Sequence, residues 1–93
     1  MGKFRVKIEK LADEHFRKHF KSGDKASIKK IKQIVAELSE HPYIGTGKLE
    51  ALRNELSGFW SRWINKKDRL IYRVDENIVF VFIISAMGHY NDK

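Results

Sequence analysis

The chain has 93 residues, a length that suits one small domain and excludes a multidomain enzyme. Its composition, with 42% hydrophobic residues, 33% charged residues and one proline, is ordinary for a globular fold and excludes disorder and low-complexity repeats. The 19 Lys and Arg outnumber the 12 Asp and Glu, and the net charge of +7 favours a polyanionic partner: nucleic acid, an acidic protein or an anionic membrane surface. We interpret residues 1–93 as a single domain.

Cysteine is absent, which excludes a disulfide framework and a cysteine-based zinc site. Small chains without such crosslinks usually belong to reducing compartments, so we expect a cytosolic, cytoplasmic protein. The longest apolar run, residues 78–84, is too short to cross a bilayer, and the first residues lack the apolar segment of a signal peptide. No membrane partner is therefore expected.

The first half of the chain is predicted to form one strand and two helices. Residues 3–8 alternate polar and apolar side chains, which is typical of a strand with one buried face. From about Leu11 the apolar residues recur at helical spacing as far as Ser22 and Gly23, where glycine can end a helix. Asp24 is placed to cap a second helix, which should end before Pro42.

The second half is predicted to be a loop followed by three strands. Residues 41–48 hold a proline and two glycines and form the loop. The strands are expected at 58–64, 69–74 and 78–84, and their short connections indicate an antiparallel meander. The last segment is apolar on both faces, which is typical of the middle of a sheet. The predicted fold is α+β: a small antiparallel sheet with both N-terminal helices packed on one face, in the order β-α-α-β-β-β.

Two features resemble ligand sites only superficially. His15 and His19 stand four apart on one helical face, but Phe16 occupies the position where a zinc-protease motif needs glutamate, so we favour a semi-buried pair at the edge of the core. The segment Gly45 to Lys48 resembles a phosphate-binding loop but lacks its full spacing and does not lead into a helix. No metal site is predicted.

The polar residues after the loop match the chemistry of RNA cleavage without a metal ion. That reaction needs a base for the ribose 2′-hydroxyl, an acid for the leaving 5′-oxygen and cations for the phosphate. Glu50 and His89 are candidates for the base and the acid, while Arg69 and Arg73 share one strand face. The competing interpretation, which composition alone favours, is that Glu50 is a solvated loop carboxylate and the arginines lie on an ordinary solvated strand face.

The aromatic residues also allow two interpretations. Trp60 and Trp63 either stack on RNA bases or belong to the core, and we favour the core. Tyr72 is expected to face the helices, and Tyr43 and Tyr90 are better placed to contact a base.

Four motifs between about Pro42 and Tyr90 resemble the YoeB/Txe family of toxins, which belongs to the RelE/ParE superfamily of bacterial toxin–antitoxin modules. They occur in the family's order and close to its spacing. The motifs are Gly45-Thr46-Gly47-Lys48-Leu49-Glu50-Ala51-Leu52, Leu56-Ser57-Gly58-Phe59-Trp60-Ser61-Arg62, Asp68-Arg69-Leu70-Ile71-Tyr72 and Gly88-His89-Tyr90.

The resemblance implies a RelE-like microbial ribonuclease fold and an mRNA endoribonuclease that cuts in the ribosomal A site, without metal or cofactor, and so inhibits translation. Glu50 matches the family's general base, Arg69 the arginine that stabilises the transition state, and His89 the general acid, with Tyr90 beside it. The positions expected to contact RNA are Lys48, Arg53, Arg62, Arg73 and Tyr90.

The sequence departs from the family pattern near these positions. Leu49 and Ala51 replace two prolines that flank the glutamate, which should make that loop less rigid. Trp63 replaces the second arginine of a pair, and Asp68 replaces a histidine before Arg69, where its charge could hold the arginine or partly neutralise it.

The resemblance also implies partners: an antitoxin whose acidic flexible segment covers the basic sheet, the bacterial ribosome with its mRNA, and in some members a second copy of the toxin. The alternative functions are a non-nucleolytic toxin of the same fold, such as a ParE-like gyrase poison, and an inactive basic RNA-binding module. A gyrase poison would have no reason to keep Glu50, Arg69 and His89 together, so the endoribonuclease is favoured.

Overall fold

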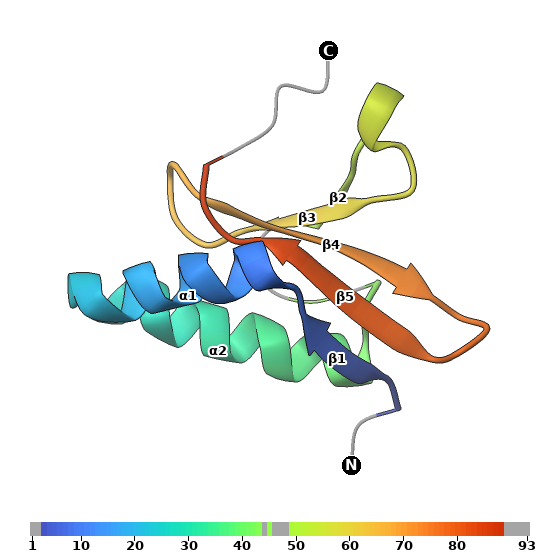
Figure 1. Ribbon diagram of the computed structural model, residues 1–93, viewed down its shortest axis with the longest axis horizontal. Helices are drawn as coiled ribbons and strands as arrows, with labels where there is room; N and C mark the ends of the chain where they lie inside the picture. The colour runs from blue at the N-terminus through green and yellow to red at the C-terminus, as the bar shows by residue number, and fades with distance from the viewer. Residues whose placement is uncertain (1–2, 44, 46–48, 89–93) are drawn as a thin grey trace.

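The computed structural model describes residues 3–43, 45 and 49–88, with the side chain of Leu56 left out. Eight elements follow one another along the chain (Figure 1). They are β1 (Arg5–Ile8), α1 (Lys10–Ser22), α2 (Lys25–Glu40), β2 (Glu50–Ala51), a short 3-10 helix η1 (Asn54–Leu56), β3 (Trp60–Trp63), β4 (Arg69–Asp75) and β5 (Phe80–Ser85).

The helix boundaries follow the local signals in the sequence. α1 ends at Ser22 and is capped by Gly23, which adopts a left-handed conformation with φ 77°. Asp24 caps α2: its carboxylate accepts hydrogen bonds from the backbone N–H and the hydroxyl of Ser27, and these bonds lower the pKa of Asp24. α2 ends at Glu40, before Pro42 as predicted. Within the described ranges, neither helix is long and apolar enough to cross a membrane.

The five strands form one sheet in the order β1-β5-β4-β3-β2. β3, β4 and β5 pair antiparallel in turn, which confirms the predicted meander, and β5 lies inside the sheet as its apolar sequence indicated. The two-residue strand β2, which was not predicted, pairs antiparallel with β3. The pairing of β1 differs from the expected antiparallel arrangement, because β1 runs parallel to β5. A parallel pair needs a long connection, and both helices and three strands lie between β1 and β5 in the sequence.

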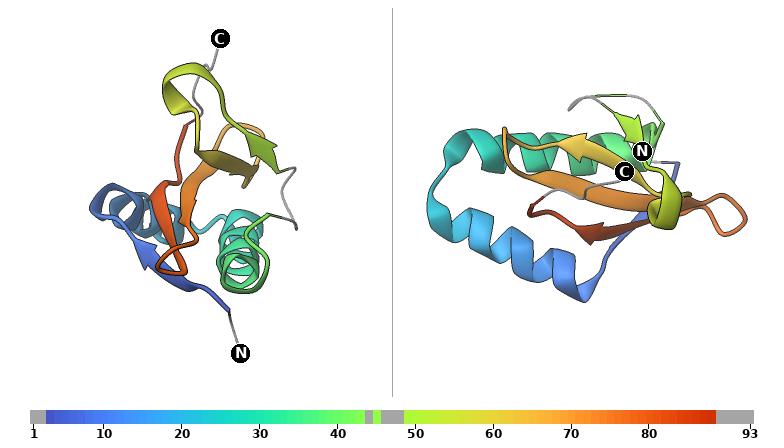
Figure 2. Two further views of the ribbon diagram at one scale, coloured as in Figure 1. Left: turned by 90° about the vertical axis from the view of Figure 1, so that its right-hand side faces the viewer. Right: turned by 90° about the horizontal axis from the view of Figure 1, so that it is seen from above.

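The hydrophobic core lies between the two helices and one face of the sheet (Figures 1 and 2). Tyr72 is fully buried in this core, which confirms that it faces the helices. The buried members of the core are Ala12 and Phe16 from α1, Ile31, Ile34 and Leu38 from α2, and Ile64, Leu70, Tyr72, Val81, Ile83 and Ala86 from the sheet and the residues beside it. The helices leave the other face of the sheet uncovered (Figures 1 and 2).

Candidate active site

The sheet register brings Glu50 and Arg69 to the same face, away from the helices. Glu50 on β2 lies opposite Ser61 on β3, and Ser61 lies opposite Ile71 on β4. Arg69 is two residues from Ile71 and lies opposite Trp63. Side chains alternate between the two faces along a strand, and residues directly opposite each other share a face. The side chains on the face that the helices do not cover therefore include those of Glu50, Ser61, Trp63, Arg69 and Ile71. We call this side the outer face.

Arg69 extends across the outer face to meet Glu50. Its guanidinium carbon lies 4.5 Å from the centroid of the Trp63 ring, and its Nη2 lies 3.6 Å from Glu50 Oε1. The side chain of Arg69 is 13% exposed and that of Glu50 is 40% exposed, so the pair meets at the surface. Trp63, which replaces the second arginine of the family's pair, thus packs against the Arg69 guanidinium.

Three buried polar atoms on this face have no hydrogen-bond partner among the described residues. They are Ser61 Oγ, Arg69 Nε and Ser85 Oγ, and Ser85 lies opposite Ile71 in the register. An unpaired buried polar atom costs about 1–3 kcal/mol, and such atoms call for an explanation where they gather. Within the part of the chain that the structure describes, these three polar groups of the outer face are thus left for a partner outside it.

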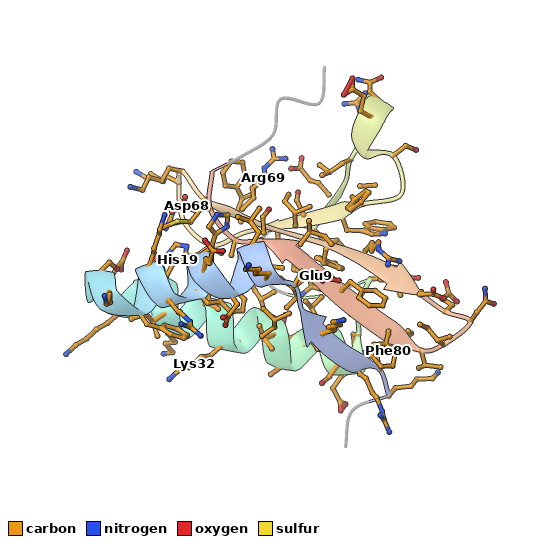
Figure 3. All side chains as sticks on the ribbon, in the orientation of Figure 1. Glu9, His19, Lys32, Asp68, Arg69 and Phe80 are labelled. Atoms are coloured by element: carbon orange, nitrogen blue, oxygen red, sulfur yellow. The ribbon has the colours of Figure 1, made fainter. Side chains whose placement is uncertain are left out.

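The chain segment that leads to His89 lies against Arg69. The backbone N–H of Arg69 donates to Gly88 O at 2.8 Å, and Gly88 N–H donates to Asp68 Oδ1 at 2.8 Å. Figure 3 shows Asp68 and Arg69 at the same end of the sheet, opposite the end that carries Phe80. His89 follows Gly88 directly in the sequence, but His89, Tyr90 and Lys48 lie outside the described residues.

The Asp68 carboxylate bonds to other groups than the Arg69 side chain. The Asp68 carboxylate accepts hydrogen bonds from Gly88 N–H and from Asn65 Nδ2, and within the described chain it forms no ion pair with Arg69. Asp68 is 6% exposed and bonds to the backbone of Gly88 instead. Asp68, which lies just before β4, therefore fixes the segment that follows β5.

The structure contradicts the expectation that Arg62 contacts RNA directly. Arg62 is fully buried on the helix-facing side of β3, where it donates to Tyr72 Oη at 3.2 Å, to Glu37 Oε1 at 2.9 Å and to the His41 carbonyl at 3.0 Å. Tyr72 in turn donates to the Pro42 carbonyl at 2.6 Å. Arg62 thus ties the end of α2, and the start of the loop that leads to Glu50, to the sheet.

Strand periodicity was the signal that could have revealed the burial of Arg62. Trp60, Arg62 and Ile64 alternate along β3 and the residue that follows it, and Ile64 is 4% exposed while Trp60 packs against the core. An arginine between two core positions on the same face must also point inward. Its charge obscured that assignment, because arginine is seldom buried unless it is paired.

The two other arginines expected to bind RNA are accessible to different degrees. Arg73 lies on the outer face, four residues along β4 from Arg69, and its guanidinium carbon lies 4.1 Å from the centroid of the Phe82 ring. Arg53 is exposed and lies two residues after the end of β2. The outer face thus carries Arg69 and Arg73, and Arg53 borders it.

The aromatic residues divide between the two faces. Trp60 packs against the core, as predicted, whereas Trp63 lies on the outer face beneath Arg69. Tyr43 contacts Trp60, with ring centroids 5.5 Å apart, and its hydroxyl donates to Glu76 Oε2 at 2.7 Å. Partial burial and the Glu76 carboxylate raise the pKa of Tyr43 to about 12. Tyr43 therefore has structural contacts away from Arg69.

The histidine pair on α1 is a semi-buried pair at the edge of the core, as predicted. His19 is 4% exposed and His15 is partly buried, and both bond to the backbone of Ala86. Among residues 3–43, 45 and 49–88, no group of three or more His, Cys, Asp or Glu side chains could hold a metal ion.

Known proteins resemble this chain in both sequence and structure. Toxin YoeB of Streptomyces coelicolor is 37% identical over 73 residues, which cover 77% of this chain and 83% of that protein. Toxin YoeB of an Escherichia coli O6:H1 strain is 38% identical over 72 residues, covering 77% and 83%.

Solved structures of Staphylococcus aureus proteins share the fold. A YoeB dimer has a TM-score of 0.78 and 32% identity, over 95% of this chain and 99% of that one. A heterotetrameric YoeB–YefM toxin–antitoxin complex has a TM-score of 0.75 and 34% identity, over 94% and 98%. The profile of the family described as YoeB-like toxin of bacterial type II toxin–antitoxin system matches residues 7–90. The chain therefore belongs to the YoeB-like family of type II toxin–antitoxin toxins.

Proposed function

We propose that this toxin is an endoribonuclease that cuts messenger RNA in the A site of the translating ribosome and so inhibits translation. The observation that carries the proposal is the contact between Glu50 Oε1 and Arg69 Nη2, which lie 3.6 Å apart on the face of the sheet that the helices do not cover. A base beside a cation is the arrangement that attack of a ribose hydroxyl on its own phosphate needs. The Gly88 carbonyl accepts a hydrogen bond from the Arg69 backbone N–H. Because His89 follows Gly88 directly in the sequence, this bond supports the proposal that His89 acts beside Glu50 and Arg69.

In the proposed reaction Glu50 takes the proton of the ribose 2′-hydroxyl, and the 2′-oxygen attacks the adjacent phosphorus. Arg69 moves from the Glu50 carboxylate to the phosphate and stabilises the negative charge that develops on its oxygens. His89 gives a proton to the 5′-oxygen as the P–O5′ bond breaks. The products are a 2′,3′-cyclic phosphate and a 5′-hydroxyl, and these steps require neither a metal ion nor a cofactor.

The proposed RNA path follows the outer face. Arg69 and Arg73 lie on β4, and Arg53 borders the face beside β2. Lys48 and Tyr90 complete the proposed contacts from the loop before β2 and from the end of the chain. Arg62 is left out of this set because it is fully buried and hydrogen-bonded.

The proposed partner that silences the toxin is an antitoxin with an acidic segment. Strand β1 extends the outer face with Arg5 opposite Phe80 and Lys7 opposite Phe82, and both cations are exposed. Together with Arg73 they form a basic surface suited to a polyanionic chain. Lys7→Glu should weaken the inhibition of the toxin by its antitoxin and leave the cleavage rate of the free toxin unchanged. Assembly as a homodimer is a further proposal, which sedimentation of the purified toxin tests.

The test of the proposed activity is an in vitro translation reaction with and without the purified protein. Primer extension on the message should show new cuts inside codons that depend on ribosomes, with 5′-hydroxyl ends on the downstream fragments. His89→Gln should fold and bind antitoxin but not cut, and Glu50→Gln should reduce the single-turnover rate by about 10²- to 10⁴-fold. Intact message and unaffected translation would reject the proposal, and inhibited DNA supercoiling would then favour a gyrase poison.

A further inference from the structure

The segment that follows β5 is held by side chains from two distant parts of the chain. His15 and His19 on α1 both bond to Ala86: its backbone N–H donates to His15 Nδ1 at 3.0 Å, and its carbonyl lies 2.7 Å from His19 Nε2. Asp68, in the turn before β4, accepts from Gly88 N–H at 2.8 Å. We call His15, His19 and Asp68 the C-terminal clamp.

Helix geometry explains how both imidazoles reach one residue. Side chains four positions apart lie one above the other on a helix, so His15 and His19 face the same peptide groups. The donor pattern also fixes their protonation: His15 Nδ1 must be unprotonated to accept from Ala86 N–H, and His19 must carry a proton on Nε2 to donate to the carbonyl. The clamp therefore depends on a neutral His15.

Two clamp members are buried and the third is partly buried. His19 is 4% exposed and Asp68 6%, His15 is partly buried, and Ala86, to which both histidines bond, is 0% exposed. Asn65 donates to Asp68 Oδ2 at 3.2 Å and to Ser27 Oγ on α2 at 2.8 Å, and its Oδ1 accepts from the Asp68 backbone N–H at 2.8 Å. Both helices and the β3–β4 turn thus help to fix the position of residues 86–88.

The segment held in this way lies between the sheet and the proposed general acid. β5 ends at Ser85, and Gly88, which has φ 70°, is the last residue before His89. The Gly88 carbonyl also accepts from Arg69 N–H at 2.8 Å, so the clamp is joined to the proposed phosphate-binding residue. Acid catalysis requires the donor to lie within hydrogen-bonding reach of the leaving oxygen, and a misplacement of about 1 Å can cost about 100-fold in rate.

We propose that the C-terminal clamp is a positioning device: His15, His19 and Asp68 set the point at which the chain carrying His89 leaves the sheet, relative to Arg69. None of the three touches the RNA. The proposal rests on the proposed function for its effect on cleavage, while its structural part, the immobilisation of Ala86 and Gly88, stands without it.

The experiment compares two substitutions of one residue. His15→Leu removes the acceptor for Ala86 N–H, whereas His15→Asn places an amide oxygen near the position of Nδ1 and restores an acceptor. On programmed ribosomes His15→Leu should lower kcat about 10- to 100-fold with little change in KM, and His15→Asn should recover most of that loss. The same contrast is expected between His19→Leu and His19→Gln, because the glutamine amide can donate from near the position of Nε2.

A second measurement separates the clamp from the proposed function. Amide hydrogen exchange of the free toxin should show slow exchange at Ala86 and Gly88, faster exchange in His15→Leu and restored protection in His15→Asn. Unchanged exchange in His15→Leu would overturn the clamp even if the toxin cuts RNA. Slow wild-type exchange with no RNA cleavage by the wild-type toxin would reject the proposed function and retain the clamp. Wild-type kcat in His15→Leu, or an equal loss in both His15 variants, would overturn its positioning role.

Discussion

Two arginines on neighbouring strands have opposite environments. Arg62 on β3 points into the helix-facing side, is fully buried and donates hydrogen bonds to Tyr72, Glu37 and the His41 carbonyl. Arg69 on β4 points to the outer face, where its Nε is buried without a partner among the described residues and its Nη2 lies 3.6 Å from Glu50. A buried cation must be fully paired to be tolerated, and an incompletely paired cation at the surface can still bind an anion.

Removal of Arg62 should have the largest effect on stability. Arg62→Leu leaves Glu37 and the Tyr72 hydroxyl without their shared partner, and breaking a buried ion pair costs about 3–5 kcal/mol. Urea unfolding of the purified variant measures the loss. Arg69→Leu is the matched control and should cost less than about 1 kcal/mol, because its ion pair is loose and reaches the surface. Equal losses in the two variants would contradict the contrast.

Removal of Arg69 should have the larger effect on activity. Loss of a group that stabilises transition-state charge typically lowers the rate by about 10²- to 10³-fold, and we expect this for Arg69→Leu in ribosome-dependent cleavage. Arg69→Lys should recover part of the rate, because it keeps the charge but loses the planar guanidinium that lies over Trp63. A folded Arg69→Leu toxin that cuts at the wild-type rate would exclude the proposed role.

Acidification should weaken the contact between α1 and the end of β5. Burial lowers the pKa of His15 below 6.5, nearby Lys18 and His19 lower it further, and Glu14 and Asp68 oppose the shift. The unfolded chain then binds the proton more readily than the folded chain, so this stabilisation is complete above about pH 6.5 and is lost as the pH falls. Urea unfolding at pH 7.5 and 5.5 should show a greater loss for wild type than for His15→Asn, which cannot titrate. Identical losses would show that His15 does not contribute.

The smallest expected effect concerns the unpaired hydroxyl of the outer face. Ser61→Ala removes a buried Oγ that has no partner among the described residues, so stability should stay constant or rise by up to about 1 kcal/mol. Ser27→Ala on α2 is the control and should lower stability by about 1 kcal/mol, because its hydroxyl bonds to Asp24 and Asn65. A destabilised Ser61→Ala variant would mean that the outer face is more completely paired than we infer.

The local features of the fold were predictable from neighbouring residues. Gly23 and Asp24 mark the junction of the helices, and Pro42 lies just beyond the second helix, because helix ends depend on backbone conformation and on capping over a few residues. The antiparallel meander followed from short connections. The parallel pairing of β1 with β5 was not predictable in this way, because it joins segments more than 70 residues apart.

The sequence by itself determined the residue types of the candidate site and the α+β class. The chemistry of a site depends on which side chains are present, and the type of each element follows from the spacing of its apolar residues. Only the tertiary structure decided which cations face solvent: the same charge is buried at Arg62 and available at Arg69 because each strand has one face against the helices. The tertiary structure also decided what the two departures from the family pattern contact: Trp63 packs against Arg69, and Asp68 accepts a hydrogen bond from Gly88. The physical reason is that charge is a property of one residue, whereas burial and pairing depend on side chains that only folding brings together.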